Sequence, residues 1–108
     1  MKVTKLVFII GHVLLIIQSG LAQQIQWQSG GWAFACDFKN NDLTDARIPG
    51  DQCGGRCAST RSCTHFTWTT YNGGTCWMKS GSVSQSNAFF TGDNSMVCGI
   101  VGKFMFEF

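Results

Sequence analysis

The chain has 108 residues, with eight Lys and Arg against six Asp and Glu, and six cysteines. Two of the eight basic residues, Lys2 and Lys5, lie in the first 22 residues, so the remaining 86 (108 − 22) carry six basic and six acidic residues and no net charge. This balance gives no support for binding to nucleic acid or to a membrane surface, which needs a basic patch. The length allows one domain, whose hydrophobic core is marginal by itself.

The N-terminal segment has the pattern of a secretory signal. The two lysines precede an apolar run over residues 6–17, and Gly20 and Ala22 supply the small residues of a cleavage site, so we expect cleavage after Ala22. An uncleaved anchor is the alternative, but the run is shorter than the roughly 20 apolar residues of a transmembrane helix. The sequence therefore predicts a cleaved signal peptide over residues 1–22 and a secreted, extracellular single domain over residues 23–108, with no stable membrane insertion.

The first part of this domain predicts strands and then a loop. Apolar residues alternate with glutamines over residues 25–29, and alternation resumes over residues 32–36, a period of two that indicates β-strand. Residues 39–50 (KNNDLTDARIPG) are polar and end in a Pro-Gly pair. We expect a loop there.

A short helix is predicted next. Asp51 is placed to cap it, and Cys53 and Cys57 are four residues apart, so both would lie on one face. Gly54 and Gly55 each cost about 1 kcal/mol in a helix relative to Ala. We expect them to let the helix backbone lie close to a neighbouring element. An irregular loop is the alternative.

A β-hairpin follows the helix. Residues 64–70 alternate along a strand rich in β-branched and aromatic side chains, residues 71–74 form the turn, and residues 75–79 return. Phe66 and Trp68 share one strand face, which we expect to pack in the core.

The last part of the chain predicts a loop and a terminal strand. Residues 80–95 are rich in Ser, Asn and Gly around a short apolar patch over residues 88–90, and residues 97–108 alternate again. Because an unpaired strand of this kind aggregates, we expect it to pair with the N-terminal strand. Its Phe-rich end places three phenylalanines on one face: Phe104, Phe106 and Phe108.

An even number of cysteines in a small secreted domain predicts a disulfide framework. A bridge between Cys53 and Cys57 on one helix face would strain the bond, so we expect each of them to reach outward. Cys57 has the nearby Cys63, just past the helix, and Cys53 can reach the hairpin. The remaining two cysteines, one near each end of the domain, would then link the terminal strands by a disulfide. The expected pairs are Cys36 with Cys98, Cys53 with Cys76, and Cys57 with Cys63.

Four motifs, in this order and spacing, resemble the PAN/Apple domain family over residues 32–100. They are CDF at 36–38, CGGRC at 53–57, CTHFTW at 63–68 and GTCWMK at 74–79. The resemblance implies the same nested disulfides and a small disulfide-rich α+β fold, with a curved antiparallel β-sheet packed around one short helix. Family members are extracellular modules that bind protein or carbohydrate, and those with these motifs resemble modules of secreted, lectin-like proteins.

The residues favour a binding protein over an enzyme. A zinc site from Cys53, Cys57, Cys63 and His65 is the sharpest alternative, but its spacing does not fit common zinc modules and secretion favours disulfides. Paired cysteines leave no thiolate nucleophile, and the aspartates are scattered through predicted loops, with no catalytic geometry. We therefore predict no catalytic residue, no metal site and no cofactor.

Exposed aromatic and charged side chains are the remaining candidates for ligand contacts, because large aromatics suit both sugar faces and protein hot spots. The first hypothesis is a module that binds extracellular or cell-wall polysaccharide. The second is a protein-interaction module of the same fold, using the sheet surface or the Phe-rich terminal strand. A third, more distant one is a structural or defensive protein with no specific ligand. The candidate ligand-binding residues are Arg56, Arg61, His65, Tyr71, Trp77 and Lys79.

Overall fold

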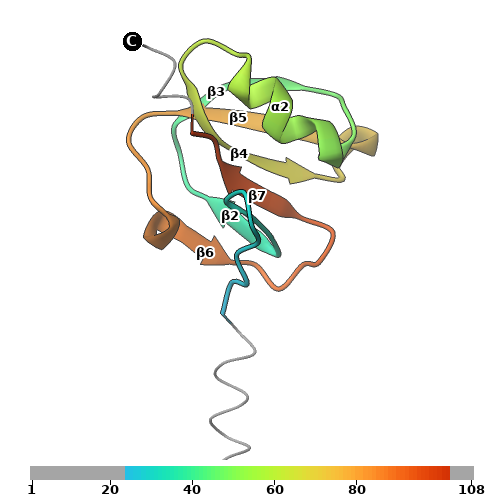
Figure 1. Ribbon diagram of the computed structural model, residues 1–108. Helices are drawn as coiled ribbons and strands as arrows, with labels where there is room; N and C mark the ends of the chain where they lie inside the picture. The colour runs from blue at the N-terminus through green and yellow to red at the C-terminus, as the bar shows by residue number, and fades with distance from the viewer. Residues whose placement is uncertain (1–23, 103–108) are drawn as a thin grey trace, which may run out of the picture.

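The structure is a computed structural model that describes residues 24–102 (Figure 1). The expected signal peptide and the phenylalanines at 104, 106 and 108 lie outside the described residues, so those predictions stay untested. Among residues 24–102, no helix is both long enough and apolar enough to cross a membrane.

Two antiparallel sheets and one short helix make up the described part of the chain. The larger sheet has five strands in the order β1 (Trp32–Phe34), β7 (Val97–Ile100), β4 (Cys63–Thr69), β5 (Thr75–Ser80) and β3 (Asp42–Ala46). The smaller sheet pairs β2 (Cys36–Phe38) with β6 (Ala88–Phe90), and the helix is α2 (Cys53–Ala58). Short 3₁₀ turns are η1 (Gly50–Gln52), η2 (Tyr71–Gly73) and η3 (Gln85–Asn87).

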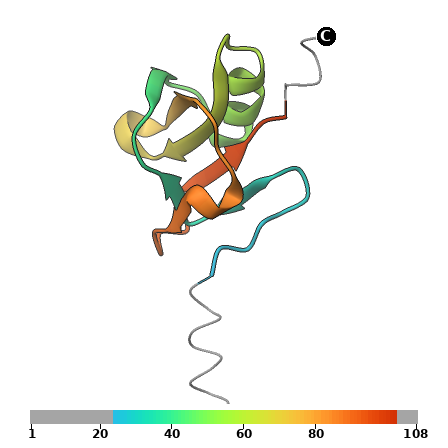
Figure 2. The same ribbon diagram turned by 90° about the vertical axis from the view of Figure 1, so that its left-hand side faces the viewer.

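The elements form three layers. In Figures 1 and 2, α2 lies beside the upper part of the five-stranded sheet, level with β3, and the β2–β6 sheet lies lower. The core that includes the cysteines of α2 is separate from the core that includes Cys36 and Phe38 of β2. We call these the helix side and the pocket side of the large sheet. The arrangement confirms the predicted α+β class, a small disulfide-rich domain with antiparallel strands and one short helix.

The β4–β5 hairpin lies inside the large sheet and confirms the predicted strand, turn and return. On its helix side, Phe66 is paired with Met78 and Trp68 with Cys76. Phe66 and Met78 are buried in a core with the cysteines of α2, and half-buried Trp68 packs against that core. The alternation seen in the sequence therefore places Phe66 and Trp68 under the helix, as predicted.

The pocket side has a separate core. Ala33, Cys36, Phe38 and Cys98 are buried together there, with half-buried residues such as Ile100 packed against them. Strand β7 pairs with β1 along one edge and with β4 along the other. Within the described residues, the predicted pairing of the terminal strands is thus confirmed.

All six cysteines form disulfides, in the pairs expected from the sequence. Cys57 is joined to Cys63 and Cys53 to Cys76, so both of these bonds tie α2 to the hairpin on the helix side. Cys36 is joined to Cys98 on the pocket side, which ties the small sheet to β7.

The strands of the N-terminal half differ from the prediction in three details. The loop expected over residues 39–50 contains β3, an edge strand that pairs with β5 through its backbone. Its first four residues are exposed, so burial imposes no apolar alternation that could have revealed the strand. Residues 25–29 form an isolated bridge between Gln28 and Trp32 where a strand was expected.

The strand predicted over residues 32–36 is broken by a turn. Ala35 has a φ of 58° and separates β1 from β2. Its N–H donates to the carbonyl of Met96 and its carbonyl accepts from the N–H of Thr91, both at 2.8 Å. These bonds hold the turn that carries the chain from the large sheet to the small one.

The helix also forms differently from the prediction at its first turn. Asp51 lies in η1, and the N-cap residue is Gln52, whose side chain makes no capping hydrogen bond to any described residue. A Cβ on Gly55 would meet no described atom within 4 Å, so the expected close approach is wrong there. A Cβ on Gly54 would be in ordinary contact with Phe66, at 3.4 Å.

Candidate functional site

A pocket of about 440 Å³ lies on the pocket side, between the β2–β6 sheet and the loop that leads into β6. We call it the polar pocket. It combines an aromatic ring, a cation and neutral hydrogen-bonding groups, and none of the described residues that line it is acidic. Its lining includes Lys39, Asn41, His65, Ser82, Asn87 and Phe89.

Two phenylalanines from the small sheet have different roles at this pocket. Phe38, on β2, is buried, and its ring packs edge to face against the His65 ring with centroids 4.8 Å apart. Phe89, on β6, keeps 38% of its surface exposed. The Lys39 ammonium lies 5.7 Å from the centroid of the Phe89 ring, within cation–π range. Phe38 therefore supports the pocket, whereas Phe89 offers an accessible ring face.

The loop before β6 is held by its own hydrogen bonds. The Asn87 carbonyl oxygen Oδ1 accepts the backbone N–H of Ser84 at 2.8 Å, in a capping box around η3. Within the described residues, the amide nitrogen of Asn87 and the side chains of Asn41 and Ser82 have no hydrogen-bond partner. These groups are donors and acceptors that a ligand could satisfy.

His65 forms part of the pocket wall although only 2% of its surface is exposed. Its Nδ1 lies 2.8 Å from the Thr64 hydroxyl, which donates its own proton to the carbonyl of Gly81 at 2.7 Å. Because a hydroxyl has one proton, Nδ1 of His65 must carry the hydrogen of the first bond. This leaves Nε2 as an acceptor. Nε2 has no hydrogen-bond partner among residues 24–102, and no fully buried polar side-chain atom of these residues lacks a partner, so Nε2 is not fully buried in the pocket wall that His65 forms.

The surroundings of His65 favour its neutral form. Burial removes water from the ring and lowers the pKa of His65, and the positive charge of Lys79 lowers that pKa further. At neutral pH the imidazole is therefore an uncharged group whose Nε2 accepts a hydrogen bond.

Lys79 is placed differently from the expected ligand contact. It is 5% exposed, and its ammonium donates to Asp42 Oδ1 at 2.6 Å and to the carbonyl of Asn40 at 3.3 Å. The pairing of β3 with β5 brings Asp42 opposite Lys79 and explains this burial. The amine holds the sheet edge and is not an accessible cation.

The other predicted contacts do not converge on one surface. At one end of the hairpin, Tyr71 is 59% exposed and lies against half-buried Trp77, with ring centroids 5.8 Å apart. Arg61 is exposed in the turn before β4, so the seven residues of that strand, at about 3.3 Å each, separate it from Tyr71. Arg56 is exposed on α2. The structure brings together Tyr71 and Trp77 and leaves the two arginines apart from them.

The cysteines of the alternative zinc site form disulfides and cannot bind a metal ion. Cys53, Cys57 and Cys63 are all disulfide-bonded, which removes the thiolates that such a site needs. Across the described residues, no group of three or more His, Cys, Asp and Glu side chains is arranged to hold a metal ion.

Most of the polar pocket was missed by the sequence analysis. Asn41, Ser82 and Phe89 are far apart along the chain, and each belongs to a segment that reads as a loop. One signal was present in the sequence: residues 80–95 combine Ser and Asn with an apolar patch at 88–90, and ligand pockets combine apolar side chains with a few polar groups.

Comparison with known proteins adds no relative. Neither a scan against models of protein families nor a search of curated proteins finds a match to this chain. The class that the structure defines is a small α+β domain with three disulfides.

Proposed function

We propose that the chain is a secreted, PAN/Apple-like module that binds extracellular or cell-wall carbohydrate in the polar pocket. The observation that carries this proposal is the meeting of an exposed aromatic ring with unpaired amide and hydroxyl groups. The nested disulfides and the helix packed on a sheet support the family part of the proposal. The three disulfides also suit an extracellular setting.

A sugar ring requires both kinds of group that the pocket offers. Its C–H face is apolar and weakly positive, so it stacks on the negative face of an aromatic ring such as Phe89. Its hydroxyls both donate and accept, and they match the side chains of Asn41 and Ser82 and the Nε2 acceptor of His65. Lys39 adds a positive charge that would favour a sugar bearing a carboxylate or sulfate.

The test is binding to a glycan array, together with pull-downs on insoluble cellulose and chitin and on polygalacturonate. We expect Phe89→Ala to weaken binding about tenfold, and Asn41→Ala to weaken it roughly two- to tenfold through one lost hydrogen bond. Tyr71→Ala is the matched control, because it removes an exposed aromatic from the hairpin end and leaves the polar pocket intact. Loss of binding in the control alone would move the site to the Tyr71–Trp77 pair.

The second candidate is a protein-interaction module of the same fold. It is favoured by a largely apolar groove on the helix side, which offers few hydrogen bonds to a sugar. If the chain binds none of the polysaccharides in these assays, the carbohydrate proposal fails and a protein ligand becomes the better explanation.

A further inference from the structure

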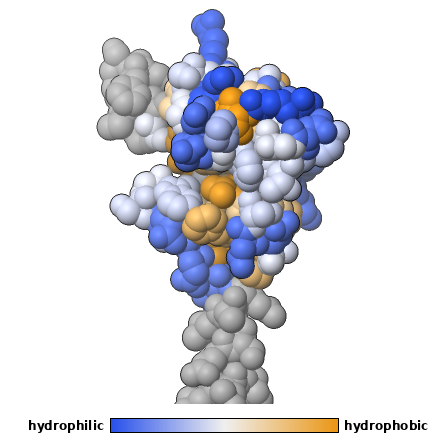
Figure 3. All heavy atoms as spheres, turned by 90° about the vertical axis from the view of Figure 1, so that its right-hand side faces the viewer, coloured by the Kyte–Doolittle hydropathy of each residue, from blue (hydrophilic) through white to orange (hydrophobic). Residues whose placement is uncertain are grey.

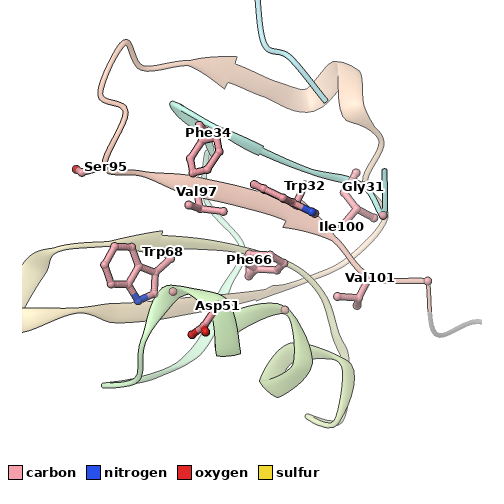
Figure 4. A pocket seen from close by; sticks show the side chains of 14 residues that line it. Gly31, Trp32, Phe34, Asp51, Phe66, Trp68, Ser95, Val97, Ile100 and Val101 are labelled. Atoms are coloured by element: carbon pink, nitrogen blue, oxygen red, sulfur yellow. The ribbon is translucent and has the colours of Figure 1, made fainter. Parts of the chain in front are cut away.

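A second cavity, of about 660 Å³, lies on the helix side between α2 and the β1–β7 edge of the large sheet (Figure 4). We call it the aromatic groove. Its walls are formed by seven apolar side chains: Trp32, Phe34, Phe66, Trp68, Val97, Ile100 and Val101. The polar side chains that reach it are those of Asp51 and Ser95. The groove therefore suits apolar side chains, in contrast to the polar pocket.

The groove is open to solvent. Phe34 is 50% exposed, and its ring packs edge to face on Trp32 with centroids 5.1 Å apart. In Figure 3, hydrophobic residues gather near the middle of the face seen from the right-hand side of Figure 1, between hydrophilic residues above and below. An accessible apolar surface of this kind is typical of an interaction site.

The chain itself continues from one end of the groove. Figure 4 shows Val101 at one end and Ser95 at the other, and Gly102, the next residue, also lines the groove. The segment that follows, KFMFEF over residues 103–108, alternates phenylalanine with other residues. As an extended segment it reaches about 20 Å, at about 3.3 Å per residue, which exceeds the length of the four-residue strand β7.

We propose that residues 103–108 fold back at Gly102 and place their phenylalanines in the aromatic groove of the same chain. Gly102 is suited to the reversal because glycine accepts backbone conformations that other residues avoid. The alternation puts all three phenylalanines on the face that enters the groove. A tether this short keeps the segment at a local concentration in the millimolar range or above, so it occupies the groove ahead of a second copy of the chain.

The aromatic groove is thus a peptide site with a built-in ligand. An external protein segment with aromatic residues in alternation would bind there by displacing residues 103–108. This site is separate from the polar pocket, and the proposal holds whether or not the polar pocket binds carbohydrate.

The test compares two triple variants of the full chain by amide NMR. One replaces the phenylalanines, and its matched control replaces the opposite face of the same segment with the same residue. We expect the first to shift the signals of groove glycines Gly30, Gly31 and Gly54, and the control to leave them in place. The variants are Phe104→Ser with Phe106→Ser and Phe108→Ser, and Lys103→Ser with Met105→Ser and Glu107→Ser.

A competition experiment gives a second readout. The peptide acetyl-KFMFEF-amide should bind the groove of the phenylalanine-free variant and restore its glycine signals. It should bind the unchanged chain at least about tenfold more weakly, because the tethered segment competes. Phe34→Ser, a change at a half-exposed side chain, should weaken peptide binding to the phenylalanine-free variant.

Two results would overturn the proposal. Glycine signals that are the same in the phenylalanine-free variant and the unchanged chain would show that the segment does not occupy the groove. Signals that change on dilution, together with a dimeric mass, would assign the groove to the segment of a second copy.

Discussion

The two sides of the five-stranded sheet are built from different chemistry. On the helix side, two disulfides and the rings of Phe66 and Trp68 form an apolar core that opens into the aromatic groove. The pocket side of the β4–β5 hairpin holds the buried polar and charged side chains of the described residues: His65, Thr67, Thr75 and Lys79. One sheet therefore presents a hydrophobic cavity on one side and a hydrogen-bonding pocket on the other.

The buried polar groups on the pocket side are bonded, which explains how they are tolerated. Thr67 donates to Asp37 Oδ1 at 2.7 Å, and Thr75 donates to the carbonyl of Tyr71 at 2.7 Å. The first bond links β4 to β2, so it helps to dock the small sheet. The helix side is therefore held by packing and two disulfides, whereas the pocket side combines its own hydrophobic core and one disulfide with directional hydrogen bonds.

The largest predicted effect concerns the disulfide that crosses to the small sheet. Cys36 and Cys98 are separated by 62 residues, against 6 for Cys57 and Cys63. In the chain-entropy model, removing the first bond by paired Cys→Ala substitutions costs about 4 kcal/mol of unfolding free energy, and removing the second costs about 2 kcal/mol. Urea unfolding of the two double variants measures this difference. Equal losses would mean that loop length does not set the stability of the two sides.

The next prediction tests packing on the helix side. A Cβ on Gly99 would lie 2.6 Å from Cζ of Phe66 and 3.1 Å from Cβ of Trp32, so neighbouring side chains must move. We expect Gly99→Ala to lower the free energy of unfolding by up to about 3 kcal/mol. Gly55→Ala is the control, since its Cβ would point into open space and alanine favours a helix by about 1 kcal/mol. In thermal unfolding, Gly99→Ala should lower the midpoint temperature and Gly55→Ala should raise it. An unchanged midpoint for Gly99→Ala would show that the core is loosely packed around Gly99.

The helix side was largely predictable from the sequence, for physical reasons. Alternation in β4 places Phe66 and Trp68 on one face, and the spacing of Cys53 and Cys57 makes both cysteines face the hairpin. These are local patterns, which periodicity reveals. By contrast β3 carries exposed polar side chains along a sheet edge, and the pairing of its backbone leaves no pattern in the sequence.

The polar pocket was less predictable because it is assembled by tertiary contacts. The turn at Ala35 directs the chain from β1 into β2 of the second sheet. Alanine rarely adopts a positive φ, so the sequence does not predict a turn at this position. Unless this turn is predicted, nothing in the sequence indicates that Phe89 and Asn41 line the same pocket. Lys79 reads as a surface cation, and its burial follows from the unpredicted partner strand β3.

A smaller effect is expected at that partner strand. Asp42→Asn leaves the nearly buried ammonium of Lys79 without its counter-charge, and because Asp42 is largely exposed we expect a loss of about 1 kcal/mol. Asp45→Asn, an exposed change on the same strand with no ion pair to any described residue, should have no measurable effect. Urea unfolding at low and high salt measures both. If the two variants are equally stable, the ion pair contributes nothing to the pocket side.

The last prediction is a pH dependence confined to the pocket side. The folded pKa of His65 lies below its unfolded value, so below about pH 6.5 the unfolded chain binds more protons than the folded one. The contribution of His65 to stability is therefore complete above about pH 6.5 and is lost as the pH falls through and below this value. Thermal midpoints measured from pH 7.5 to 5 should decline for the unchanged chain and stay nearly level for His65→Gln, which cannot titrate. Parallel declines in the two thermal midpoints would place the pH-sensitive group elsewhere.

The same protonation should affect binding. Because the Nε2 acceptor of His65 lines the polar pocket, its protonation should weaken carbohydrate binding over the same pH range, whereas peptide binding in the aromatic groove should not change.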